Sequence, residues 1–503
     1  MIDNNAINKA KWIATGNGAH LVLQEFLDRV QLRSGRQQMS TETFLIGLIL
    51  TINEYRHCEL KKVAEVLEHL PPEIKAELGI NNSILKALYR FNAKLTKARD
   101  YSIERAPELD TATRKWRYLK GAELTDKLLA ATLIPRPEGS EDYSMDSSGI
   151  WDKDLSRSKD RAKERHGPDG LFMVVQDASW GYKTAKLGES EQFYGYDLHV
   201  IIREPKIGNT PEEPKLIEHM SLTPAGTEIV EPSLNLIDRI LFKGQKIKYL
   251  LTDRHYSFKV TARWMKPLRR RGIMPVSDLH PSEMGFRPFE SVPWAAGMPY
   301  CPRVPEHLGS IKPFHPNMSD AQKEELNNKH AERGPYRAKL HTPLDAEMRM
   351  RCACPALSGQ IGCSLRQGTV TLAEKNQLPI VINPPKLENA PKLCTQKTVQ
   401  YQFKTEDELM IIKNHQSPVW GTPEWRKNYG RRSSVEGAFG TIKATVGLRR
   451  RQVLVNGIAM QEMMISIYCA LSNMRAYQNW CQRTGLGDPN HPLTPEVSNR
   501  LAA

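Results

Sequence analysis

The sequence lacks any apolar run long enough to cross a membrane. Its longest apolar stretches, residues 44–52 and 463–471, are about half of the ~20 residues that a membrane-spanning helix needs. The first residues, Met1 to Trp12, have neither the cationic start nor the apolar run of a signal peptide. We therefore predict a cytoplasmic protein with no membrane partner.

Cysteine is also scarce, with eight in 503 residues, and without a secretion signal we expect reduced thiols rather than a disulfide framework. Cys352, Cys354 and Cys363 lie within one short span, which Cys301 and Cys394 flank. Four thiolates can hold a structural zinc ion. However, C-x-C followed by a lone cysteine is not a recognised zinc-finger spacing, so we favour buried free thiols.

The charge balance is what stands out in the composition. There are 71 Lys and Arg residues against 57 Asp and Glu residues, which gives a net charge of +14. This excess predicts a polyanionic partner, and nucleic acid is favoured over a membrane surface because no basic amphipathic anchor is present. The length fits two to four domains.

Residues 1–135 are predicted to form a helical N-terminal DNA-binding region. Apolar residues recur at helical spacing between about residues 19 and 98, and Ser40 begins a helix-start signal. The helix expected over residues 83–97 carries cations at three- to four-residue spacing: Lys86, Arg90, Lys94 and Lys97. This helix is a candidate recognition helix, although a solvated helix face explains the same charges. A polar linker is expected over about residues 105–140.

Residues 136–278 are predicted to form the first part of an α/β core with a mixed sheet. A short strand is expected to end at Asp146. Apolar strands are expected at residues 171–176, 193–203, 216–222, 246–252 and 273–276. Helices are expected over residues 232–242 and 257–271.

The rest of the chain is divided into three further regions. Residues 279–409 are rich in proline and contain short strand-like pieces, such as residues 368–372 and 399–403, which predicts a β-rich insertion. Residues 410–485 are expected to complete the core and to include an apolar helix over residues 458–480. Residues 486–503 are a polar tail.

One stretch, residues 428–451, combines charged groups with an apolar face. On a single helix, four polar residues fall within a stripe about 60° wide: Tyr429, Arg432, Glu436 and Lys443. Four apolar residues gather on a neighbouring face that would pack on a core: Val435, Phe439, Ile442 and Val446. The pattern holds one carboxylate among an aromatic hydroxyl and two cations.

The spacing Y-x2-R-x3-E-x6-K resembles the signature of bacterial insertion-sequence transposases of the DDE class. The resemblance covers about residues 143–276 and 428–480. It implies an RNase H-like core of the retroviral-integrase superfamily, in which Glu436 is the third metal-binding carboxylate. The predicted order of strands and helices agrees with such a core.

DNA cleavage and joining by phosphoryl transfer needs divalent ions such as Mg²⁺ or Mn²⁺, which prefer carboxylate oxygens. Asp253 follows a predicted strand, at the sheet edge where ligands bind in α/β folds. We expect Asp253 and Glu436 to be two of the three metal ligands. For Asp146 and Asp177, the two candidates for the remaining ligand, the alternative is a turn or helix-capping role.

The first carboxylate has two candidates. The strand pattern alone favours Asp177. The resemblance favours Asp146, which lies in a D-[AGST]-[ST] context, and it matches Asp177 and Lys183 to a later motif that does not bind metal. We choose Asp146 and keep Asp177 as the alternative.

The resemblance also implies how the protein holds DNA. It places Tyr429, Arg432 and Lys443 at phosphates near the transferred strand end, and the cations Arg449, Arg450 and Arg451 are expected to contact the DNA backbone. The implied protein is a homodimer on double-stranded DNA in the bacterial nucleoid. It would cleave at the inverted-repeat ends of its element and join them to target DNA. The alternatives are a domesticated or inactive DNA-binding derivative and a metal-dependent nuclease that does not transfer strands.

Overall fold

The computed structural model describes residues 2–29, 39–80, 84–135, 141–152, 175–184, 190–208, 213–312, 314, 317–448 and 455–495. The chain divides into two compact units. The first unit comprises residues 1–140, 145–245 and 433–503, and the second unit comprises residues 141–144 and 246–432. The fold is mixed α/β, as predicted. None of the helices in the described ranges is long and apolar enough to span a bilayer.

The first unit begins with seven described helices. They are α1 (Asn4–Thr15), α2 (Ala19–Arg29), α3 (Thr41–Tyr55), α4 (Leu60–Glu68), α5 (Pro72–Glu77), α6 (Ile84–Arg99) and α7 (Thr111–Ala130). Helix α3 starts where the sequence predicts, because the Ser40 hydroxyl accepts a hydrogen bond from the Thr43 amide at 3.0 Å. Helix α6 buries its apolar face and leaves Lys86, Arg90 and Lys97 exposed.

The prediction of a polar linker over residues 105–140 is wrong. Helix α7 occupies its centre and is capped by Asp110, whose carboxylate accepts from the Thr113 amide at 2.8 Å. The apolar positions of α7, among them Leu124 and Leu128, are fully buried in the core of the first unit. The buried face of α7 also includes Arg117, Gly121 and Thr125, so its apolar helical period is incomplete in the sequence.

The strands of the main sheet are β1 (Asp142–Trp151), β2 (Ser179–Thr184), β3 (Ser190–Arg203), β4 (Ile217–Pro224), β5 (Tyr249–Thr252) and β6 (Met274–Val276). The hydrogen-bonded order is β2-β3-β1-β5-β6, and β4 also pairs with β3. Strand β3 is antiparallel to both β2 and β4, whereas β5 and β6 are parallel. Strand β1 begins in the second unit and continues in the first.

Two strand predictions need correction. Strand β1 does not end at Asp146 but runs on to Trp151, since its polar residues Asp146 to Ser148 are accommodated in mid-strand. The strand expected at residues 171–176 falls mostly outside the described residues, and Val175 and Gln176 are not in a strand. The strands expected at residues 193–203, 216–222, 246–252 and 273–276 are confirmed, with shifted ends.

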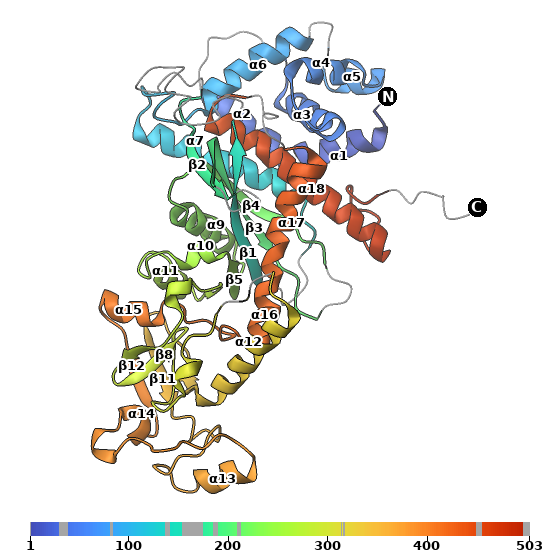
Figure 1. Cartoon of the computed structure of the whole chain (residues 1–503). Helices are drawn as coiled ribbons and strands as arrows, with labels where there is room; N and C mark the ends of the chain where they lie inside the picture. Colours follow the sequence, from blue (N-terminus) through green and yellow to red (C-terminus); the bar gives the residue numbers. More distant parts are fainter. Residues whose placement is uncertain are drawn as a thin grey trace, which may run out of the picture. The chain divides into compact units, whose positions relative to one another are not determined.

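Helix α9 (Val230–Phe242) confirms the prediction for residues 232–242. The predicted helix over residues 257–271 is instead two short helices, α10 (Arg254–Ser257) and α11 (Met265–Arg270). The first unit closes with α18 (Ile458–Thr484), whose first half is buried almost all round and which packs against α7, α3 and β4 (Figure 1). This confirms the apolar helix predicted over residues 458–480.

In the second unit, the segment predicted as a β-rich insertion contains two three-stranded sheets. They are formed by β7 (Arg287–Phe289), β8 (Val292–Ala295) and β9 (Met298–Pro299), and by β10 (Lys339–Thr342), β11 (Arg349–Ala353) and β12 (Val399–Gln402). The helices in and after it are α12 (Asp320–Arg333), α13 (Thr369–Lys375), α14 (Lys392–Thr395) and α15 (Glu406–Ile412). The strand predicted at residues 368–372 is wrong, because Gly368, at φ 75°, precedes α13 as its N-cap.

The stretch from residue 428 to residue 451 is not one helix. Helix α16 (Pro423–Tyr429) leads into a 3₁₀ turn (Gly430–Arg432), then α17 (Ser433–Gly440) and a π-helical segment (Thr441–Val446), which ends at Gly447 with φ 97°. The division between the two units falls between Arg432 and Ser433. Wider π-helical turns also change the angle between Glu436 and Lys443 from the one that a uniform α-helix gives.

Candidate active site

Two aspartates follow the parallel strands β5 and β6 in the second unit. Leu251 pairs with Val276, so Asp253 and Asp278 each lie two residues beyond a paired position at the same edge of the sheet. The Asp253 carboxylate accepts a hydrogen bond from the Arg254 amide at 2.6 Å and caps α10. The sequence analysis did not single out Asp278, although it follows a predicted strand as Asp253 does.

Asp278 is buried and held on both sides. Its carboxylate forms an ion pair with Arg254 and accepts a hydrogen bond from the Trp420 indole at 3.0 Å. An additional hydrogen bond comes from the Leu279 amide at 2.9 Å. Asp278 therefore fixes the side chain that directly follows Asp253.

Tyr429 lies in the same electrostatic environment. Its ring stacks on Trp425 with centroids 4.8 Å apart and planes 10° apart, and the Arg432 guanidinium lies 5.8 Å from the ring centroid. Burial raises the pKa of Tyr429, and the nearby carboxylates of Asp278 and Asp253 raise it further, whereas Arg432 and Arg254 lower it. The phenol is thus neutral and near Asp253 within the second unit.

Asp146 lies in the part of β1 that belongs to the first unit. Its carboxylate accepts a hydrogen bond from the Ser147 amide at 2.7 Å. Two residues further on, and on the same face of the strand, the Ser148 hydroxyl accepts a hydrogen bond from Lys443 Nζ at 2.6 Å. The structure therefore brings Lys443 to the face of β1 that carries Asp146.

The side chain of Lys443 is largely shielded from solvent. Burial lowers its pKa from 10.5 to about 8, and the positive charge of Lys183 on β2 lowers it in the same direction. Its ammonium also lies 5.8 Å from the centroid of the Phe439 ring. A cation that is partly desolvated in this way gains more from an incoming phosphate than a fully hydrated one does.

Glu436 is on the exposed face of α17. The apolar residues around it are buried in the core of the first unit, as the sequence predicted: Val435, Phe439, Ile442 and Val446. Two residues earlier in the chain, the Ser434 hydroxyl donates to the fully buried Glu204 carboxylate at 3.0 Å, which ties α17 to the end of β3. The helix thus presents Glu436 from a fixed backbone.

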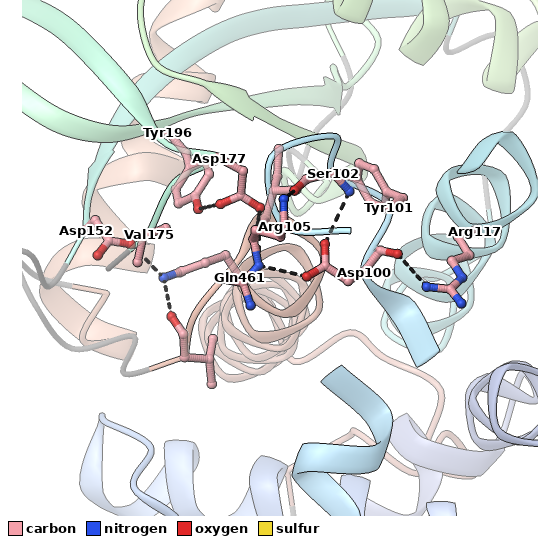
Figure 2. A network of polar contacts seen from close by, with 12 residues as sticks. Asp100, Tyr101, Ser102, Arg105, Arg117, Asp152, Val175, Asp177, Tyr196 and Gln461 are labelled. Atoms are coloured by element: carbon pink, nitrogen blue, oxygen red, sulfur yellow. Dashed lines mark hydrogen bonds and ion pairs between the residues drawn. The ribbon is translucent and has the colours of Figure 1, made fainter. Parts of the chain in front are cut away.

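Asp177, the alternative first aspartate, is 5% exposed. Both of its carboxylate oxygens accept hydrogen bonds from other residues of the protein. Figure 2 shows its carboxylate accepting a hydrogen bond from the Tyr196 hydroxyl at 2.8 Å, and its other oxygen accepts from the Ile458 amide at 2.9 Å. Burial raises the pKa of Asp177. Because Ile458 is the first residue of α18, Asp177 caps that helix.

The network around Asp177 continues toward the N-terminal helices (Figure 2). Arg105 lies 3.9 Å from Asp177 and donates from Nε to Asp100 at 2.7 Å. The Arg117 guanidinium donates to the Asp100 carbonyl at 2.6 Å. These contacts give Asp177 a structural role, which joins α18 to the segment between α6 and α7.

The expected DNA-contacting cations are only partly described. Arg449, Arg450 and Arg451 lie outside the described residues. In the second unit, Arg431, which the sequence analysis did not single out, donates to the Asp142 carboxylate at 2.6 Å. Arg431 therefore fixes the start of β1 in that unit.

The cysteines considered for zinc lie in two different apolar clusters. Cys352 on β11 packs with the cluster that contains Trp294 and Tyr401, whereas Cys354 and Cys363 pack with Cys301. Burial raises the pKa of Cys301 and Cys352 to about 12, so both thiols are protonated. Cys352 therefore does not share an apolar cluster with Cys354 and Cys363, the two other cysteines that were considered for zinc.

In the described ranges, no group of three or more His, Cys, Asp or Glu side chains is arranged to hold a metal ion. Asp146 and Glu436 belong to the first unit and Asp253 to the second. The donor chemistry of these three side chains, which are hard carboxylate oxygens, suits Mg²⁺ or Mn²⁺.

Residues 389–477 match a family model described as a transposase DDE domain. The matched segment contains Tyr429, Arg432, Glu436 and Lys443, together with most of α18. No curated protein matches the chain significantly. The similarity to transposase DDE domains covers this segment of the chain.

Proposed function

We propose that the protein cleaves DNA at the inverted-repeat ends of an insertion sequence and joins the cleaved 3′ ends to target DNA. The observation that carries this proposal is the transposase DDE match over the segment that contains Glu436. The order β4-β3-β1-β5-β6, with β3 and β4 antiparallel and β5 and β6 parallel, supports an RNase H-like core. Residues 279–409 then form an insertion between Asp253 and the helix of Glu436.

In this proposal Asp146, Asp253 and Glu436 hold Mg²⁺ or Mn²⁺ during the reaction. Divalent ions bound there supply Lewis-acid stabilisation of the attacking and leaving oxygens in an in-line displacement. Asp177 is not a ligand in this account, because its two oxygens already accept hydrogen bonds from Tyr196 and Ile458. Asp278 acts through Arg254, which it orients beside Asp253.

The neighbouring cations position the DNA. Lys443 offers a point charge to a phosphate on the face of β1 that carries Asp146, and Arg432 can hold a phosphate with two hydrogen bonds. Tyr429 contributes a neutral hydroxyl donor. Arg449, Arg450 and Arg451, with the exposed cations of α6, add contacts to the backbone of the element ends, which are held by a homodimer.

The test is a cleavage and joining assay. Its substrates are a labelled duplex that carries the end of the element, taken from the DNA that flanks the gene, and a supercoiled target plasmid. We expect Mg²⁺-dependent release of a 3′ hydroxyl at the end and transfer of the label to the plasmid. Cleavage without joined product would indicate a nuclease instead. Binding without cleavage, in Mg²⁺ or Mn²⁺, would indicate a non-catalytic DNA-binding derivative.

A further inference from the structure

Cysteines from separate segments of the second unit meet at one end of the sheet formed by β10, β11 and β12. The strands are antiparallel, so β11 ends where β10 and β12 begin. Cys354 directly follows the last residue of β11, and Cys394 lies on α14, which precedes β12. The Cys301 amide donates a hydrogen bond at 2.8 Å to the carbonyl of Tyr336, just before β10. The sheet register therefore brings three cysteines to the same end.

Cys363 is the fourth cysteine at this place. It packs with Cys301 and Cys354 in one apolar cluster. Three residues after Cys363, the Arg366 guanidinium donates to the carbonyls of the two residues that follow Cys394, at 3.4 and 2.7 Å. Burial raises the pKa of the thiols, and within every pair among the four cysteines the charge of one thiolate raises the pKa of the other further. Like charges act on one another in this way only at short range.

Two of the four sulfur atoms already accept hydrogen bonds from backbone amides. Cys301 Sγ accepts from the Arg303 amide, and Cys363 Sγ accepts from the Leu365 amide, in each case two residues further on. Each cysteine begins a tight turn, in which the amide three residues on donates to the cysteine carbonyl at 2.9 Å. Burial raises the pKa of both thiols, whereas the amide donors lower it. These donors favour the thiolate, which is the form that binds metal.

Arg366 supplies a positive charge beside the same sulfur atoms. Its buried Nε has no hydrogen-bond acceptor among the described residues. Burial raises the pKa of Cys363 and Cys394, and the charge of Arg366 opposes this effect. A divalent ion with four thiolates carries a net double negative charge, which a neighbouring guanidinium partly compensates.

The chain around these cysteines has little apolar core of its own. Residues 354–398, all of which the structure describes, contain two short α-helices, α13 and α14, and no strand. Only six buried residues form the apolar cluster here, and three of them are cysteines. Five large apolar side chains are instead exposed: Leu357, Leu372, Ile380, Ile382 and Leu387. Segments with so small a core commonly depend on a structural metal ion.

We propose that four cysteines of the second unit bind one structural zinc ion: Cys301, Cys354, Cys363 and Cys394. The ion ties residues 354–398 to the end of the sheet, and the thiol protons are released to solvent on binding. In the described structure the thiols are not already arranged around a metal position. Rotation about the Cα–Cβ bond moves each sulfur atom without moving the backbone, so the ion draws the four sulfur atoms together. The proposal does not rest on the proposed function.

The test is the metal content of the full-length, reduced protein, together with cobalt(II) substitution. We expect one zinc ion per chain, and one equivalent of Co²⁺ should give the visible absorption of tetrahedral cobalt with four thiolates. Cys394→Ser should weaken zinc binding by at least about a hundredfold, because a lost ligand costs more than a lost outer partner. Cys394→His keeps a ligand, so it should retain one zinc ion and change the cobalt spectrum.

Cys352→Ala is the matched control. Cys352 is also buried and lies only two residues from Cys354, but it packs in a different apolar cluster. This variant should keep one zinc ion per chain. A reduced wild type that binds neither Zn²⁺ nor Co²⁺ would overturn the proposal, and this measurement needs no variant to fold. Loss of zinc from Cys352→Ala but not from Cys394→Ser would also overturn it, as would a zinc-free wild type whose four cysteines form disulfides.

Discussion

In the second unit, Asp253 lies in a densely connected environment, whereas in the first unit Glu436 stands on an exposed helix face. Next to Asp253, the buried Asp278 carboxylate forms an ion pair with Arg254 and accepts a hydrogen bond from the Trp420 indole. Glu436 lies on α17, whose apolar residues are buried in the core of the first unit. The proposed reaction would thus use one ligand that follows a strand of the sheet and one that is carried by a helix packed on a core.

The signature Y-x2-R-x3-E-x6-K is divided in the same way. Tyr429 and Arg432 belong to the second unit. There burial raises the pKa of Tyr429, the carboxylates of Asp278 and Asp253 raise it further, and the charge of Arg432 lowers it. Glu436 and Lys443 belong to the first unit, where Lys443 contacts the strand of Asp146. A sequence motif that reads as one helix face therefore serves two structural units.

The largest expected effects come from the proposed ligands themselves. Glu436→Gln and Asp253→Asn should each lower the cleavage rate by at least about a hundredfold, because the loss of a carboxylate ligand weakens a stabilisation of several kcal/mol. Binding of the element end should change by no more than a few-fold, since these side chains hold metal rather than DNA. More than a tenth of wild-type cleavage in either variant would refute its assignment.

A smaller effect is expected for Asp278→Asn. The variant should lower cleavage by about 10–100-fold, as is common when a residue that orients a ligand is changed. Its positioning role predicts a higher Mg²⁺ requirement, so raising the Mg²⁺ concentration should recover part of the rate. Thermal unfolding of the same variant is the control. If cleavage falls only in proportion to the folded fraction and shows no shift in Mg²⁺ dependence, Asp278 has only a structural role.

Lys443 gives a pH-dependent prediction for the first unit. In the free protein its pKa is about 8, so Lys443 is charged at pH 7 and mostly neutral at pH 9. Because phosphate binding favours the charged form, DNA affinity should fall as pH rises, by about tenfold at pH 9. Lys443→Arg should remove this fall, since a guanidinium stays charged.

Lys443→Ala should also reduce the slope of binding against salt concentration by about one unit. Fluorescence anisotropy with a labelled element end measures both quantities. Equal pH profiles for the wild type and Lys443→Arg, or an unchanged salt slope, would mean that Lys443 does not contact a phosphate.

The smallest effect on activity is expected for Asp177→Asn. The change leaves one of the donors from Tyr196 and Ile458 without an acceptor and should lower the free energy of unfolding by ~1–3 kcal/mol. Cleavage below the unfolding transition should stay within a few-fold of the wild type. Complete loss of cleavage in a fully folded Asp177→Asn protein would instead favour Asp177 as the first carboxylate.

Much of the fold follows from local sequence patterns. Strand β3 and helix α18 have long apolar patterns in the sequence, and both were predicted. Helix α7 was missed because its buried face contains Arg117, Gly121 and Thr125 as well as leucines, and tertiary packing buries them together. The strand expected at residues 368–372 fails because β-branched residues there follow a left-handed Gly368 that starts a helix.

The candidate site was predictable only in part. The spacing around Glu436 and the strand before Asp253 are visible in the sequence. The capping role of Asp177 is not, because the amide it accepts from belongs to Ile458, 281 residues later. The same holds for the contact of Lys443 with Ser148, which joins positions 295 residues apart.

The central claim is the proposal that Asp146, Asp253 and Glu436 hold the metal ions of one reaction, and cysteine substitution tests it most directly. A thiolate binds Mg²⁺ poorly and Mn²⁺ better, because it is a softer ligand than a carboxylate. Asp146→Cys, Asp253→Cys and Glu436→Cys should therefore be inactive in Mg²⁺ and regain cleavage in Mn²⁺, whereas Asp177→Cys should show no such metal dependence. Absence of Mn²⁺ rescue at Asp253 or Glu436, or rescue at Asp177 instead of Asp146, would contradict the account.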